Sequence, residues 1–215
     1  MESHPAHSIG DPDEVARISK QIFPLEEKVR QGWKIERKLK QPAWDEFLAI
    51  CRVLMRYDAL KDKDDGQGPT PTAFGRLVGA INADNQLWMA LVLTRPNIQS
   101  LGHTELASLM PAIINEYSRP DTMTLYGASE RVIGFLDELG PVASELSEIQ
   151  ILEQADIPVR LDGMLCGLVE GWASGCDWSE LVDSTSLDQG DLCRILRRTM
   201  EILRQIPVLV SESWR

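Results

Sequence analysis

The feature that most constrains the fold is a long amphipathic pattern near the carboxyl end of the chain. At about 100° of rotation per residue, its apolar-face positions fall on one side of a helix, namely Leu192, Ile195, Leu196, Thr199, Ile202, Leu203 and Ile206. The opposite face carries Arg194, Arg197, Arg198, Glu201, Arg204 and Gln205. Such a helix needs a protein core on its apolar side and leaves a basic stripe exposed.

The start of this helix has its own signals. Ser186 followed by Gln189 has the form of a capping box, and Asp188 and Asp191 place negative charge near the positive end of the helix dipole. The helix is therefore predicted to start near Leu187.

Apolar residues recur at intervals of three and four through most of the remaining chain. This spacing predicts further helices over residues 43–60, 84–93, 104–117, 128–146, 148–154, 161–172 and 178–182. Trp44 and Phe47 are expected to face the core, Asp84 to cap its helix, and Trp88 to be a core residue rather than a platform for a base. We predict an all-α multi-helix bundle whose last two helices form a helix-turn-helix-like pair.

Glycine and proline interrupt two of the predicted helices. Gly140-Pro141 predicts a kink or a break at that point. Gly163, Gly167 and Gly171 would each weaken a helix by about 1 kcal/mol relative to alanine. Their spacing of four is compatible with a close helix–helix approach on one face or with loose packing, and the sequence leaves both open.

Domain boundaries are predicted from composition. Residues 1–42 form a mobile segment and a helical appendage, and residues 43–215 form the bundle. A charged segment rich in glycine and proline, at about 61–72, is expected to be a flexible linker after which Thr70 or Thr72 caps the next helix.

The appendage contains a basic segment around Trp33, formed by Arg30, Lys34, Arg37, Lys38 and Lys40. Basic residues with an interleaved aromatic can bind single strands through phosphate contacts and base stacking. We favour a solvated helix face with one docking tryptophan, because charge runs are most often solvated surface.

The charge balance limits nucleic-acid binding to local contacts. A net charge of −11 disfavours a protein that grips phosphates through bulk electrostatics. No segment is apolar enough to span a bilayer, and the amino end lacks a secretory pattern, so we expect no membrane contact. The cytoplasm and the plastid stroma both remain open.

Catalytic and metal-binding motifs are absent from the sequence. The four cysteines show no Cys-x-x-Cys spacing and are expected to be buried free thiols, without a metal. A phosphate-binding loop needs a Lys-Ser or Lys-Thr pair, which does not occur, and there is no Asp-Glu-x-His box. We therefore expect no cofactor and no ATPase activity from this chain alone.

Two blocks of sequence resemble the C-terminal domain of superkiller-like DExH RNA helicases, called DSHCT. The first block is Phe74-Gly75-Arg76-Leu77-Val78-Gly79-Ala80-Ile81-Asn82-Ala83-Asp84-Asn85-Gln86-Leu87-Trp88. The second runs from Val169-Glu170-Gly171-Trp172-Ala173-Ser174-Gly175 through Trp178 to Gln189-Gly190-Asp191-Leu192-Cys193-Arg194-Ile195-Leu196-Arg197-Arg198-Thr199. The resemblance covers roughly residues 43–206 and is greatest to the cyanobacterial and chloroplast branch.

The resemblance implies a role in RNA handling. In that family the domain lies over two RecA-like ATPase domains and guides single-stranded RNA in 3′-5′ unwinding, with its C-terminal helices acting as a ratchet. By motif, Arg198 matches an RNA-contacting arginine and Glu116 an acidic residue that approaches a base, while Arg194 is a weaker candidate on the same stripe. For Arg197 we favour a plain ion pair with a carboxylate such as Glu201.

Three hypotheses follow. The first is an accessory domain of an ATP-dependent RNA helicase, whose partners are single-stranded RNA and a RecA-like core. The second is a stand-alone helical module that binds another protein, which fits the negative net charge. The third, a helix-turn-helix DNA-binding protein, conflicts with that charge and with the length of the last helix.

Overall fold

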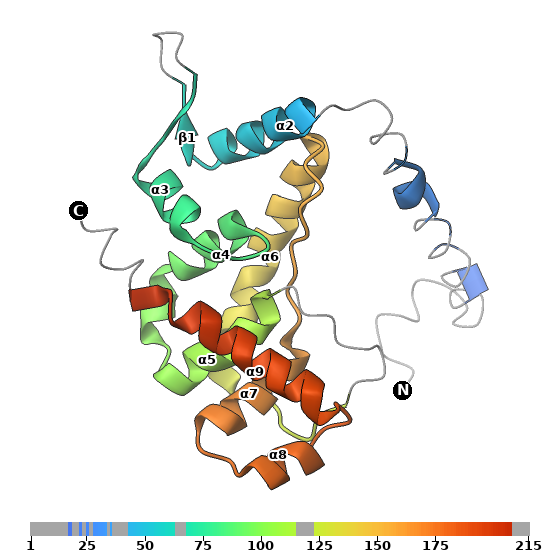
Figure 1. The fold of residues 1–215 in the computed structure, drawn as a ribbon, viewed down its shortest axis with the longest axis vertical. Helices are drawn as coiled ribbons and strands as arrows, with labels where there is room; N and C mark the ends of the chain where they lie inside the picture. Colours follow the sequence, from blue (N-terminus) through green and yellow to red (C-terminus); the bar gives the residue numbers. More distant parts are fainter. Residues whose placement is uncertain are drawn as a thin grey trace, which may run out of the picture. The chain divides into compact units, whose positions relative to one another are not determined.

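Helices form most of the regular structure in the computed structural model (Figure 1), which describes residues 17–18, 22, 25, 28–33, 35, 43–62, 68–114 and 123–207. The α-helices are α2 (Ala43–Arg56), α3 (Ala73–Ala80), α4 (Gln86–Leu93), α5 (His103–Ile113), α6 (Glu130–Leu152), α7 (Cys166–Ala173), α8 (Trp178–Asp183) and α9 (Gln189–Leu203). Two 3-10 turns, η2 (Pro96–Ser100) and η3 (Gly163–Leu165), precede α5 and α7. The predicted all-α class is confirmed, and none of the described helices is long and apolar enough to cross a membrane.

The chain divides into two compact units, Met1–Leu48 and Ala49–Arg215. In the first unit, the rings of Trp44 and Phe47 stack with centroids 5.2 Å apart. They are 64% and 50% exposed, so the prediction that they face the core is wrong. Trp33 is also exposed, whereas most of the basic residues predicted around it lie outside the described residues.

The second unit has two neighbouring hydrophobic clusters. The larger is built mainly by α4, α5 and α6 around Trp88, Leu109 and Leu139. The other joins α5, α7, α8 and α9 around Leu168, Leu181, Leu192 and Ile195. Figure 1 shows α9 crossing over α5, and the apolar face of α9 supplies buried residues to both clusters. Each fully buried leucine contributes about 1.5–3 kcal/mol.

Helix α6 is continuous from Glu130 to Leu152, so of the kink or break predicted at Pro141 the break does not occur, and the separate helix at 148–154 is wrong. Just beyond its end, Glu153 accepts hydrogen bonds from Arg52 Nε at 2.8 Å and Arg56 Nε at 2.7 Å. These bonds, first from Arg56 and then from Arg52, hold the pKa of the Glu153 carboxyl below its usual range. The pair of arginines thereby fastens the last turns of α2 to the end of α6.

Two short strands pair at the two ends of the predicted linker. Strand β1 (Leu60–Lys61) pairs antiparallel with β2 (Thr70–Pro71). Thr72 then caps α3 as predicted, because its Oγ1 accepts a hydrogen bond from Gly75 N at 3.0 Å.

Two helix starts differ from the sequence prediction. Helix α4 is capped by Asn85 rather than Asp84, since Asn85 Oδ1 accepts from Trp88 N at 3.0 Å. Helix α9 begins at Gln189 and is capped by Asp188, whose Oδ1 accepts from Asp191 N at 2.8 Å. For α9 the cause is tertiary pairing. Residues 184–186 pair with residues 123–125, and the Ser186 hydroxyl accepts a hydrogen bond from Met123 N instead of capping the helix.

Candidate functional site

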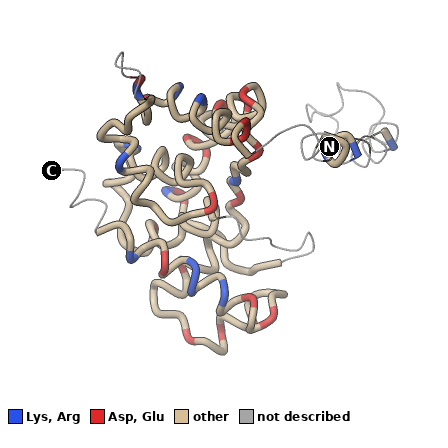
Figure 2. Tube along the Cα trace, turned by 45° about the horizontal axis from the view of Figure 1, so that its top comes forward, with Lys and Arg blue, Asp and Glu red and all other residues tan. Residues whose placement is uncertain are grey.

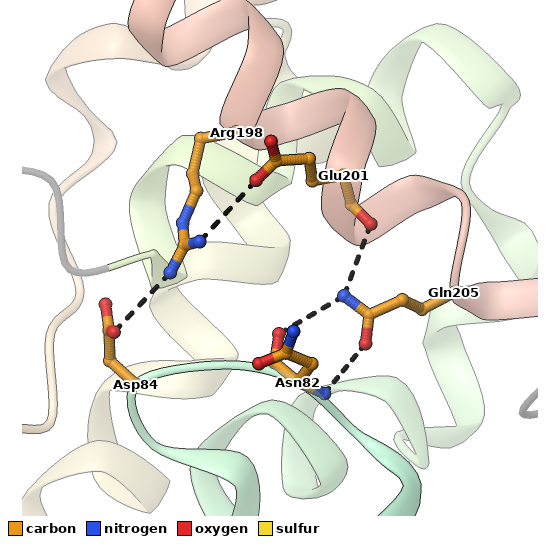
Figure 3. Close-up of polar contacts among 5 residues, drawn as sticks. All are labelled: Asn82, Asp84, Arg198, Glu201 and Gln205. Atoms are coloured by element: carbon orange, nitrogen blue, oxygen red, sulfur yellow. Dashed lines mark hydrogen bonds and ion pairs between the residues drawn. The ribbon is translucent and has the colours of Figure 1, made fainter.

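The carboxyl end of α9 is bonded to the loop between α3 and α4 (Figure 3). Gln205 Oε1 accepts a hydrogen bond from Asn82 N at 2.8 Å, and Gln205 Nε2 donates to Asn82 O at 3.2 Å. The same Nε2 donates to Glu201 O at 3.2 Å within the helix. The Gln205 amide thus both accepts from and donates to the Asn82 backbone, and it joins two segments 123 residues apart in sequence.

Arg198 points from α9 toward the same loop. Its guanidinium lies 3.4 Å from Asp84 Oδ1 and 3.5 Å from Glu201 Oε2. Both distances exceed the 2.7–2.9 Å or so of a strong charge-assisted hydrogen bond. The side chains of Asp84 and Glu201 are about half exposed, so each pair contributes on the order of 0–1 kcal/mol. Arg198 is held in place but remains open to a competing anion.

A small hollow lies beside Arg198, with a volume of about 10 Å³. It has room for roughly one water molecule. Its lining combines two residues of α9 with residues of three other segments, including Asp84, Asn85, Ile114, Arg160, Arg198 and Ile202. The site therefore depends on the whole tertiary fold rather than on α9 alone.

The connection between α6 and α7 forms one wall of the hollow and is fixed by two hydrogen bonds. Asn85 Nδ2 donates to Pro158 O at 3.2 Å, and the buried Trp88 donates from Nε1 to Arg160 O at 2.9 Å. Trp88 is only 1% exposed, which confirms its prediction as a core residue.

The other predicted site residues are placed as follows. Arg194 lies one turn before Arg198 on α9, is exposed, and pairs with Asp191 Oδ1 at 2.9 Å. Arg197 is exposed and forms no ion pair with the residues that the structure describes, so the predicted pairing belongs to Arg198 instead. Glu116 lies outside the described residues.

A family model described as the DSHCT (NUC185) domain matches residues 68–212, most of the chain. The chain belongs to the DSHCT family. The matched range contains helices α3 to α9 and every residue of the hollow. It also contains both sequence blocks on which the resemblance was based, so that expectation is confirmed.

Two plant relatives of this DSHCT chain are DExH-box ATP-dependent RNA helicases of Arabidopsis thaliana. The chloroplastic DExH15 is 32% identical over 176 residues, which cover 80% of this chain and 15% of the relative. DExH10 is 21% identical over 215 residues, which cover 95% of this chain and 20% of the relative. The chain spans no more than about a fifth of either helicase.

The DSHCT block at residues 169–175 has a structural role in this chain. Glu170 Oε2 accepts a hydrogen bond from Ser129 N, at the start of α6, at 2.9 Å. It also lies 3.4 Å from Ser108 Oγ of α5, which itself donates to Cys166 O at 2.8 Å. One carboxylate of α7 thus ties together three helices of the DSHCT core.

The same block ends α7 with a Schellman motif. Gly175 has a φ of +95°, a backbone conformation that residues with a Cβ atom rarely adopt. Cys176 N donates to Gly171 O and Gly175 N to Trp172 O, both at 3.0 Å. The glycine therefore turns the chain sharply from α7 into α8.

Replacing Glu170 with glutamine is expected to destabilise the DSHCT domain by about 1–2 kcal/mol, because a charge-assisted bond becomes a neutral one. Urea denaturation followed by circular dichroism measures the loss. The exposed Glu148, for which the structure gives no hydrogen bond, provides a matched Glu148→Gln control that should unfold like the wild type. Equal stability of both variants would contradict the role given to Glu170.

Basic and acidic residues alternate along the part of the chain that the structure describes. Figure 2 shows Lys and Arg interspersed with Asp and Glu along the described trace. The described residues also contain no group of three or more potential metal-ligating His, Cys, Asp and Glu side chains.

The cysteines are free thiols, but only two of them are buried as predicted. Cys51 and Cys166 lie in the core, and burial raises the pKa of Cys166 to about 12. Cys176 is partly exposed and Cys193 fully exposed, because Cys193 falls on the outer face of α9.

Sequence reasoning missed Arg160 as a component of the site. It lies in an extended connection without a periodic pattern, and only its position beside Trp88 and Arg198 brings it to the hollow. Its place after the Ile157-Pro158-Val159 run carries no signal for binding.

Proposed function

We propose that the chain is the accessory DSHCT domain of an ATP-dependent 3′-5′ RNA helicase and guides single-stranded RNA beside a RecA-like ATPase core. The proposal is supported by the family membership and by the names of the two relatives. The observation that carries it is the position of Arg198, a half-buried arginine on the basic face of α9 whose ion pairs are long and solvent-accessible. Arginine suits the task because its planar fork can bind phosphate and stack on a base.

Arg194 lies along the same helix face and is proposed as a second, weaker RNA contact. Glu116 remains the proposed residue for approach to a base. The chloroplastic relative supports the plastid stroma over the cytoplasm as the compartment.

A second candidate function is binding of another protein. The observation that favours it is the stacked and exposed pair Trp44 and Phe47. Aromatic side chains of this kind are enriched at protein interfaces.

The Arg198→Ala variant tests the RNA proposal. We expect it to bind single-stranded RNA about tenfold more weakly, since hydrogen bonds to charged groups contribute about 1.5–3 kcal/mol. The salt slope should decrease by about 0.7 for each lost phosphate contact. Fluorescence anisotropy at two salt concentrations measures both quantities.

The matched control is Arg76→Ala, because Arg76 is an exposed arginine of α3 that does not line the hollow. Both variants remove one positive charge, so a general electrostatic effect would weaken both equally. Equal binding by the two variants would refute the role of Arg198. If the wild type binds no RNA but captures a protein partner through Trp44 and Phe47, the second function holds instead.

A further inference from the structure

We propose that Arg160 is a second phosphate-binding residue, which together with Arg198 clamps one backbone phosphate of single-stranded RNA. In the absence of RNA, the Asp84 carboxylate occupies the position of that phosphate. The inference rests on the proposed RNA-guiding function. It adds Arg160 as a binding residue, a backbone phosphate as the ligand group and Asp84 as the competitor.

The first step is that two arginines line one hollow. Arg198 comes from α9, and Arg160 comes from the connection between α6 and α7. Two arginines around one small recess provide the paired donors that phosphate oxygens accept. With about 10 Å³, the hollow is too small for a base, so the ligand must bind at its rim.

The second step is the fixed position of Arg160. Its carbonyl oxygen accepts the 2.9 Å hydrogen bond from the indole of the buried Trp88. Two residues earlier, Pro158 O accepts from Asn85 Nδ2, the cap of α4. The backbone that carries Arg160 is therefore anchored to the core, while its side chain is exposed and forms no ion pair with the described part of the chain.

The third step concerns Asp84, the carboxylate that lines the same hollow. Its Oδ1 lies 3.4 Å from the Arg198 guanidinium, and its side chain is 45% exposed. Among the residues that line the hollow are two arginines and one carboxylate, while Glu201 pairs with Arg198 from outside it. An arriving phosphate can replace the Asp84 carboxylate at little cost, because an exposed pair of this kind is weak.

RNA binding by Arg160→Ala, Arg198→Ala and the double variant tests the clamp, with Arg76→Ala as the charge-matched control. We expect Arg160→Ala to weaken binding about fivefold. If both arginines bind the same phosphate, the double variant should lose less than the product of the two single effects. The clamp would be overturned if Arg160→Ala bound RNA as Arg76→Ala does, or if the fold-losses of the two single variants multiplied fully in the double variant. Either result would leave the proposed function intact. A wild-type chain that binds no RNA would overturn both.

The variants Asp84→Asn and Glu201→Gln test whether Asp84 competes with phosphate or is only an ion-pair partner of Arg198, as Glu201 is. Both carboxylates pair with Arg198, but only Asp84 lines the hollow. Asp84→Asn should bind RNA several-fold more tightly than the wild type, and the gain in affinity should be larger than for Glu201→Gln. Equal or weaker binding by Asp84→Asn would refute displacement. Competition with inorganic phosphate at matched ionic strength distinguishes the two sources of the phosphate group. A site for free phosphate would release RNA when inorganic phosphate is added, whereas a site for the RNA backbone would keep it.

Discussion

Gly167→Ala is expected to destabilise the domain by about 3 kcal/mol or more, because an added methyl group overpacks a contact between two backbones. A Cβ at this position would lie 2.4 Å from Gly127 C and Tyr126 O, and 2.6 Å from Gly127 O. All three are main-chain atoms, so no side chain can rotate away to make room. Helix α7 would have to shift away from the segment that leads into α6.

The matched control is Gly134→Ala in α6, where an added Cβ would have no neighbour within 4 Å. That variant is expected to gain about 0.5–1 kcal/mol from the higher helix propensity of alanine. Urea and thermal denaturation of both variants give the difference directly. A Gly167→Ala domain as stable as the wild type would mean that the close approach is absent in solution.

Much of the fold could be predicted from helical spacing. The pattern over residues 192–206 correctly assigned the buried face of α9, because apolar residues at three and four residues apart require a common core. The glycine spacing left a close helix–helix approach and loose packing both open, and Gly167 makes a close approach to a partner that is not a helix. Gly167 packs against the Tyr126–Gly127 backbone, which is not helical, and no periodic pattern marks such a segment.

The site could be predicted only in part. The resemblance pointed to Arg198, and the structure places it, half-buried, on the polar side of α9 beside a hollow. Its neighbours Asp84 and Arg160 could not be inferred, because they come from connections distant in sequence. Local rules also failed at the start of α9, where Ser186 bonds to Met123 instead of capping the helix.

Trp88→Ala is expected to lose about 3–5 kcal/mol of stability, as is typical for truncation of a buried aromatic side chain. The indole is 1% exposed, lies in the larger hydrophobic cluster and donates to Arg160 O. Trp88→Phe isolates the hydrogen bond more closely, because most of the apolar volume stays. Leaving the Arg160 carbonyl without its donor costs about 1–3 kcal/mol. Chemical denaturation measures both variants.

Trp178→Phe is the control, since Trp178 is 42% exposed at the start of α8 and its replacement should change stability by less than about 0.5 kcal/mol. The informative comparison is RNA binding by folded Trp88→Phe. The indole anchors the backbone that carries Arg160, so its loss should weaken RNA binding in the same direction as Arg160→Ala. If Trp88→Phe is destabilised but binds RNA like the wild type, the clamp does not depend on this anchor, and the contribution of Trp88 is confined to the core.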